Sequence, residues 1–128
     1  MSKDAGKLAG GAKLQLEIRN RGACTVVRCR GRICFREEAL NFSRTVTELL
    51  HSRSHVVLEF SGVELLDSAG IGELVLVHMQ SQAAESVVCL VSPLPRIKKL
   101  LELTNVASLF AIHPTVEDAL HSLAAKAA

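Results

Sequence analysis

The centre of the chain joins a buried strand to a helix that begins with unusually small residues. His55–Phe60 is a short, apolar, largely β-branched run, which predicts a buried strand. A loop is then expected to lead to Asp67 and to Ser68, whose hydroxyl can cap a helix by accepting a bond from an amide in the first turn. Gly70 and Gly72 each cost about 1 kcal/mol relative to Ala inside a helix. Bare backbone at these two positions predicts the close approach of another strand or of a partner.

Strand and helix patterns alternate along the rest of the chain. Alternating apolar residues before and after a turn signal predict an antiparallel hairpin over residues 14–19 and 23–30. Further strands are expected at 87–91 and 109–112, and helices at about 36–53, 68–84, from 94 and from 115. This alternation predicts a single α/β domain with a mixed, mostly parallel sheet of about five strands and about four helices, its strand order left open.

Composition limits the classes of protein to which the chain can belong. A length of 128 residues suits one domain, and 48% hydrophobic residues with a mean hydropathy of +0.27 disfavour overall disorder. The net charge of +2 comes from scattered Lys and Arg, which argues against nucleic acid as the main partner. No apolar run is long enough to span a bilayer, and residues 1–13 lack the apolar core of a signal peptide. We therefore expect a cytoplasmic protein without membrane insertion, with a flexible tail over residues 1–13 and the folded domain over residues 14–128.

The residues that most often bind metals or catalyse reactions form no recognisable set. Cys24, Cys29, Cys34 and Cys89 show neither C-x-x-C spacing nor a nearby pair of His, so we expect small buried hydrophobes in strands rather than a zinc site. The five His are dispersed, which favours structural or solvated roles. Asp67 has no evident nucleophile or acid–base partner, and no glycine-rich phosphate loop precedes a Lys. The sequence therefore predicts a protein that is not an enzyme and needs no cofactor or metal.

The run Asp67-Ser68-Ala69-Gly70-Ile71-Gly72 resembles the D-S-[SA]-G-[LIV]-G signature of anti-sigma factor antagonists. These are small bacterial signalling proteins of the STAS domain family (sulfate transporter and anti-sigma factor antagonist). The resemblance covers about residues 14–125, because the flanking elements also follow the family order. It implies the STAS fold for this domain and a phosphorylation site at Ser68, with no catalysis by the protein itself.

The resemblance also implies a function in transcription regulation. The unphosphorylated protein would bind an anti-sigma factor that is a serine kinase and so release a sigma factor; phosphorylation of Ser68 would end binding, and a phosphatase would reset it. The expected partner-binding residues are Arg32, Asp67, Ser68, Ala69, Gly70, Gly72, Leu76 and Val77. Three alternatives stay open: a STAS scaffold subunit of a stress-signalling complex, an accessory STAS subunit of a lipid or anion ABC transporter, and a small-molecule-binding STAS domain. The oligomeric state is also left open.

The helix after Ser68 has apolar residues on more than one side. Ile71, Leu74, Val75 and Met79 share one face, which we assign to the core. Leu76 and Val77 fall outside this face. Either the helix is covered on more than one side, or these two residues form an apolar contact patch flanking Ser68.

Two segments depart from the family pattern. Family members commonly carry an acidic residue after the second strand, in a Gly-x-[IL]-Asp stretch, whereas this chain has Gly31-Arg32-Ile33-Cys34. Any contact that the usual acid makes with the kinase is therefore expected to be altered. Ala84-Glu85-Ser86 replaces a glycine turn that often precedes the next strand.

Overall fold

The computed structural model describes residues 12–127 and forms a single α/β domain, as predicted. Residues 1–11 of the expected tail lie outside the described residues, but its last two residues pack on the second strand, where the backbone N–H of Arg32 donates to the carbonyl of Ala12 (3.0 Å). The elements are, in order, β1 (Gln15–Arg21), β2 (Cys24–Ile33), α2 (Phe35–His51), β3 (His55–Leu66), α3 (Ser68–Ala83), β4 (Val88–Val91), α4 (Pro95–Leu103), a 3₁₀ turn η1 (Ala107–Leu109), β5 (Ala111–His113) and α5 (Val116–Ala127).

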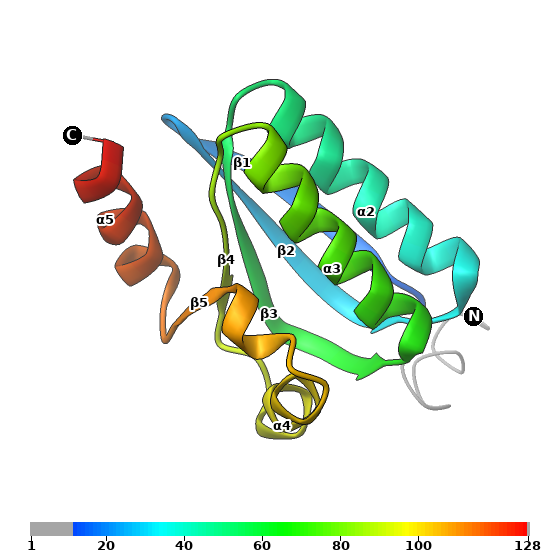
Figure 1. Cartoon of the computed structure of the whole chain (residues 1–128). Helices are drawn as coiled ribbons and strands as arrows, with labels where there is room; N and C mark the ends of the chain where they lie inside the picture. Colours follow the sequence, from blue (N-terminus) through cyan, green and yellow to red (C-terminus); the bar gives the residue numbers. More distant parts are fainter. Residues whose placement is uncertain (1–11, 128) are drawn as a thin grey trace, which may run out of the picture.

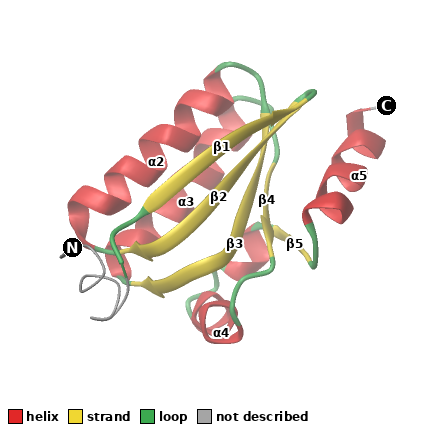
Figure 2. Ribbon diagram, turned by 180° about the vertical axis from the view of Figure 1, so that it is seen from behind, coloured by secondary structure: helices red, strands yellow, loops and turns green. Residues whose placement is uncertain are grey.

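The five strands form one sheet in the order β1-β2-β3-β4-β5 (Figure 1). β1 and β2 form the expected antiparallel hairpin, and each later pair is parallel. Because each parallel strand lies next to its predecessor, crossovers of one hand place their helices on the same face of the sheet. α2 and α3 lie side by side on that face, whereas α5 lies on the opposite side (Figures 1 and 2).

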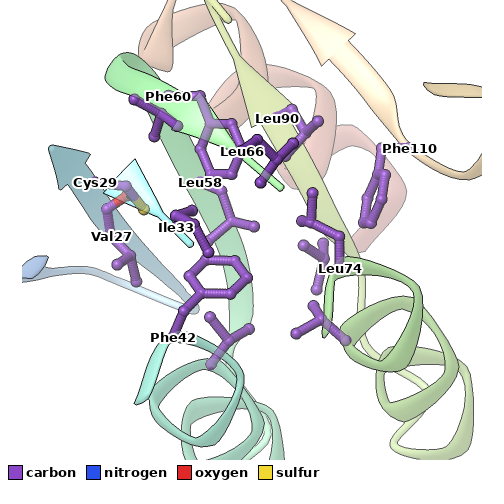
Figure 3. Close-up of a cluster of buried hydrophobic side chains, with 14 of the residues drawn as sticks. Val27, Cys29, Ile33, Phe42, Leu58, Phe60, Leu66, Leu74, Leu90 and Phe110 are labelled. Carbon is purple, nitrogen blue, oxygen red and sulfur yellow. The ribbon is translucent and has the colours of Figure 1, made fainter. Parts of the chain in front are cut away.

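The main core lies between the sheet and helices α2, α3 and α4. Figure 3 shows Phe42 from α2 and Leu74 from α3 pointing toward Leu58 and Leu90 of the central strands. A smaller cluster fixes α5 to the other face of the sheet through Ala119 and neighbouring apolar side chains. No helix within residues 12–127 combines the length and the apolar character needed to cross a membrane.

Strand β3 is longer than the sequence predicted, and this decides where Asp67 lies. The expected loop after Phe60 is instead strand as far as Leu66, because β2 continues beside it and supplies backbone partners. Register shifts between Arg28 and Arg30 and between Gly31 and Arg32 let the pairing continue to Ile33 opposite Leu66. β2 and β3 therefore end together, and each leads directly into a helix.

Three helices end in the same turn without glycine. In each, the residue after the C-cap adopts the left-handed backbone conformation: Arg53, Glu85 and Asn105 have φ of 65°, 56° and 61°. After α3, the N–H of Ser86 donates to the carbonyl of Ser81 (2.9 Å), the six-to-one bond of a Schellman motif. Ala84-Glu85-Ser86, which replaces the glycine turn of the family, therefore adopts the usual turn geometry, and the backbone of Glu85 is strained as a result.

Candidate functional site

The candidate site lies at the end of the sheet formed by the carboxyl ends of β2 and β3, where α2 and α3 begin (Figure 1). In sheets of parallel strands, ligands and partners commonly bind beyond the carboxyl ends of the strands. Here the first turns of two helices meet beside each other, and Asp67 lies between them. The site therefore combines residues that are more than 30 positions apart in the sequence, such as Phe35 and Asp67.

Asp67, not Ser68, is the N-cap of α3, so the predicted capping role of Ser68 is wrong. Oδ1 of Asp67 accepts a hydrogen bond from the N–H of Gly70 (3.0 Å), and Oδ2 accepts one from the N–H of Phe35 (2.8 Å). The bond from Phe35, together with weaker ones from α3, holds the pKa of the Asp67 carboxyl below its usual value despite some burial. One carboxylate therefore connects the first turns of both helices.

Ser68 is the first residue of α3, and its side chain is exposed. Within the described residues its hydroxyl makes no hydrogen bond, since Asp67 already occupies the nearby amide of Gly70. Ala69, which follows it, is half-buried against the main core. A kinase could therefore reach the Ser68 hydroxyl without unfolding the helix.

The two glycines of the motif have different surroundings. Gly70 is buried, and a Cβ there would overlap the carbonyl oxygen of Ile33 and lie 2.7 Å from Cδ1 of Leu66. It permits the close approach of a strand, and its predicted contact with a partner is wrong. Gly72 is exposed and has open space around it, so a partner contact there stays a prediction.

The assignment of apolar residues on α3 needs correction at two positions. Val77 is fully buried, so it belongs to the core and offers no surface to a partner. Met79, which was assigned to the core, is 57% exposed. Leu76 is 38% exposed, and it lies on the side of the helix that also carries Gly72 and Ser68, at intervals of four residues. The exposed face of α3 therefore carries Ser68, Gly72 and Leu76.

Arg32 and Phe35 form a second part of the site, and sequence reasoning missed Phe35. The Arg32 guanidinium lies 5.0 Å from the centre of the Phe35 ring, and its Nε donates to both carboxylate oxygens of Glu38 (3.0 and 3.2 Å). Phe35 is 60% exposed and has φ of 61°, which is unusual for a bulky residue. No local sequence signal marks this conformation, because it arises from the turn between β2 and α2.

The cysteines are buried, as predicted, although Cys34 lies at the start of α2 rather than in a strand. Burial is the main cause that raises the pKa of the Cys34 thiol, and the nearby Asp67 carboxylate adds to it. Burial likewise raises the pKa of Cys89 to about 11.

His55 has a structural role, since its Nδ1 accepts a hydrogen bond from the N–H of Val87 (3.0 Å). Among residues 12–127, no three His, Cys, Asp or Glu side chains lie close enough together to hold a metal.

A sequence model of the STAS domain matches residues 15–119, and the chain therefore belongs to the STAS domain family. This result confirms the family predicted from the Asp67–Gly72 motif.

Solved structures of the same fold include anti-sigma factor antagonists. SpoIIAA of Bacillus, in its unphosphorylated form, is 18% identical; the alignment covers 88% of this chain and 96% of SpoIIAA with a TM-score of 0.71. An anti-sigma factor antagonist from Mycobacterium paratuberculosis is 21% identical over 85% of this chain and 92% of its own, with a TM-score of 0.74. The STAS domain of a SulP transporter from Vibrio cholerae is 18% identical over 74% and 77%, with a TM-score of 0.60. At these identities the similarity is one of fold.

Proposed function

We propose that this chain is a cytoplasmic anti-sigma factor antagonist whose binding is controlled by phosphorylation of Ser68. Unphosphorylated, it binds an anti-sigma factor that is a serine kinase and thereby releases a sigma factor. The kinase phosphorylates Ser68 and binding is lost, until a phosphatase removes the phosphate. The observation that carries this proposal is the exposed Ser68 at the start of α3 in a STAS domain, whose hydroxyl makes no hydrogen bond to any residue from 12 to 127. SpoIIAA, which has the same fold, is known in unphosphorylated and phosphorylated forms, which supports it.

The physical basis of the switch is the desolvation of charge. A phosphate on Ser68 adds about −1.5 to −2 charges at pH 7 and three acceptor oxygens. A closely packed interface around Ser68 would have to desolvate this group, and any acidic residue of the partner would meet it as a like charge. Losing one or two well-packed contacts costs about 2–4 kcal/mol, or about 30- to 1000-fold in affinity.

The decisive experiment is treatment with the kinase, followed by mass spectrometry and a binding titration. Phosphate should appear on Ser68 and weaken binding by the factor given above, whereas Ser68→Ala should bind constitutively. Ser68→Asp should bind poorly, although one carboxylate charge mimics a phosphate only in part. Phosphate found solely on other residues, or equal affinity before and after modification of Ser68, would defeat the proposal.

The SulP neighbour favours one other function: an accessory STAS subunit of a transporter. In that case the protein should copurify with a membrane transporter, and the Ser68→Ala variant should leave this association unchanged. Copurification with a serine kinase instead of a transporter supports the antagonist.

A further inference from the structure

Phe35 combines a left-handed backbone conformation with an exposed aromatic ring. Of the four Phe, the other three are buried, and the chain has no Trp or Tyr. Its left-handed backbone serves the turn between β2 and α2, but a glycine would make the same turn without strain. The turn therefore does not account for the phenyl ring. Strained residues of this kind cluster at functional sites.

Phe35 also has neighbours from three elements: one binds its backbone N–H, one lies over its ring, and one holds that ring neighbour. The carboxylate of Asp67, at the start of α3, accepts the Phe35 N–H at 2.8 Å. Arg32, at the end of β2, lies over the ring, and Glu38 of α2 holds Arg32. An exposed aromatic side chain that is already ordered loses little conformational freedom when a partner covers it. Aromatic and Arg side chains are also the ones enriched at the centres of protein interfaces.

We propose that Phe35 is the aromatic anchor of the surface that binds the serine kinase, seated in an apolar pocket with an acceptor-bearing rim. The inference rests on the function proposed above and adds a residue outside the Ser68 motif. The positive charge of Arg32 determines the chemistry expected at the rim of the kinase pocket. Among the described residues, Arg32 binds Glu38 through Nε alone. The terminal nitrogens of Arg32 therefore face carboxylate or carbonyl oxygens of the kinase. Leu65, which pairs with Arg32 in the sheet and is partly exposed, extends the apolar surface.

The position of Phe35 also explains how one phosphate could affect the whole surface. Asp67 accepts a hydrogen bond from the N–H of Phe35 and directly precedes Ser68. The position of Asp67 therefore sets both where Phe35 lies and where the Ser68 hydroxyl lies. A kinase that covers Phe35 necessarily lies over the start of α3. The phosphate would then be placed at the edge of the anchor pocket.

The test is a binding titration of the purified serine kinase against four forms of the full chain. Phe35→Gly removes the ring and relieves the backbone strain, so it should melt at or above the wild-type temperature and bind at least tenfold more weakly. Phe35→Asn is a second ring-free variant, because Asn also tolerates this backbone conformation, and it should lose the same affinity. Glu85→Gly is the matched control, because it relieves the same backbone strain at the other end of α3, a helix of 16 residues and about 24 Å in length. This variant should bind the kinase as the wild type does.

The outcomes separate this inference from the function on which it rests. Wild-type affinity in both ring-free variants, with binding still abolished by phosphorylation of Ser68, overturns the anchor and leaves the antagonist function standing. A wild-type protein that neither binds the kinase nor is phosphorylated by it overturns both. Weak binding by Glu85→Gly as well as Phe35→Gly would assign the loss to the backbone change and also overturn the anchor.

Discussion

The two glycines of the Asp67–Gly72 motif should respond in opposite directions to the same substitution. At Gly72 a Cβ meets nothing within 4 Å, so Gly72→Ala gains the helix propensity of Ala, about 0.5–1 kcal/mol. At Gly70 the same Cβ overlaps the backbone carbonyl of Ile33 and approaches Leu66. Overpacking costs about 1–3 kcal/mol, and its upper end applies because a backbone carbonyl cannot rotate away. After the propensity gain, Gly70→Ala should lose about 2 kcal/mol.

Thermal and urea unfolding of the two variants measure this difference directly. One kcal/mol shifts the melting temperature of a domain of this size by roughly 4 °C, so the variants should differ by about 10 °C or more. The m-value should stay unchanged, which would show that both variants unfold from the same compact state. The reasoning is refuted if Gly70→Ala is as stable as the wild type, because α3 would then not pack closely on the end of β2. It is equally refuted if Gly72→Ala is destabilised.

Two further predictions follow from the corrected site. Asp67→Ala should lose about 1–2 kcal/mol of stability with the cap of α3, whereas Asp67→Asn keeps a capping oxygen. Because the pKa of Asp67 is depressed, its charge stabilises the fold above about pH 4, and this contribution is lost as the pH falls through the folded-state value. The stability difference between wild type and Asp67→Asn should therefore shrink in urea titrations from pH 5 toward pH 2; a constant difference would contradict it. Val77→Ser should cost about 2–4 kcal/mol, because Val77 is buried, while Leu76→Ser, at a partly exposed position, should cost only about 1 kcal/mol and weaken kinase binding. Equal melting temperatures for these two variants would show that the burial of α3 has been misassigned.

The sequence predicted the fold because its local patterns agree with the final structure. The hairpin, the order of strands and helices and the start of α3 at the Asp67–Gly72 motif all correspond to elements that form, although β3 extends to Leu66 and the last strand, expected at 109–112, is β5 at Ala111–His113. The periodicity of α3 was harder to interpret, since apolar residues occur around most of the helix. As a result Val77 and Met79 were placed on the wrong sides. A helix packed on both the sheet and a neighbouring helix is buried over a wide arc, and a single-sided pattern cannot describe it.

The errors at the site have a different origin, because they depend on contacts between distant segments. Asp67 and Ser68 are equally good cap residues in sequence, and the choice between them is settled by Phe35, whose N–H binds Asp67 from another helix. The extension of β3 to Leu66 likewise depends on the bulges that keep β2 in register. Neither arrangement is encoded within the motif itself. The site residues that the motif does not contain therefore come from the turn between β2 and α2, where Arg32 and Phe35 lie.

The capping role of Asp67 also decides where the charge of a phosphate on Ser68 would go. If Ser68 were the cap, the first amides of α3 would be free to bind the phosphate, and phosphorylation would stabilise the helix. Asp67 already accepts the Gly70 N–H, so the phosphate would lie beside a carboxylate that keeps its charge at neutral pH. Repulsion between the two groups favours a phosphate that points away from the helix, toward solvent or a partner. The effect of phosphorylation is therefore expected mainly at the interface, with little or no gain in the stability of the fold.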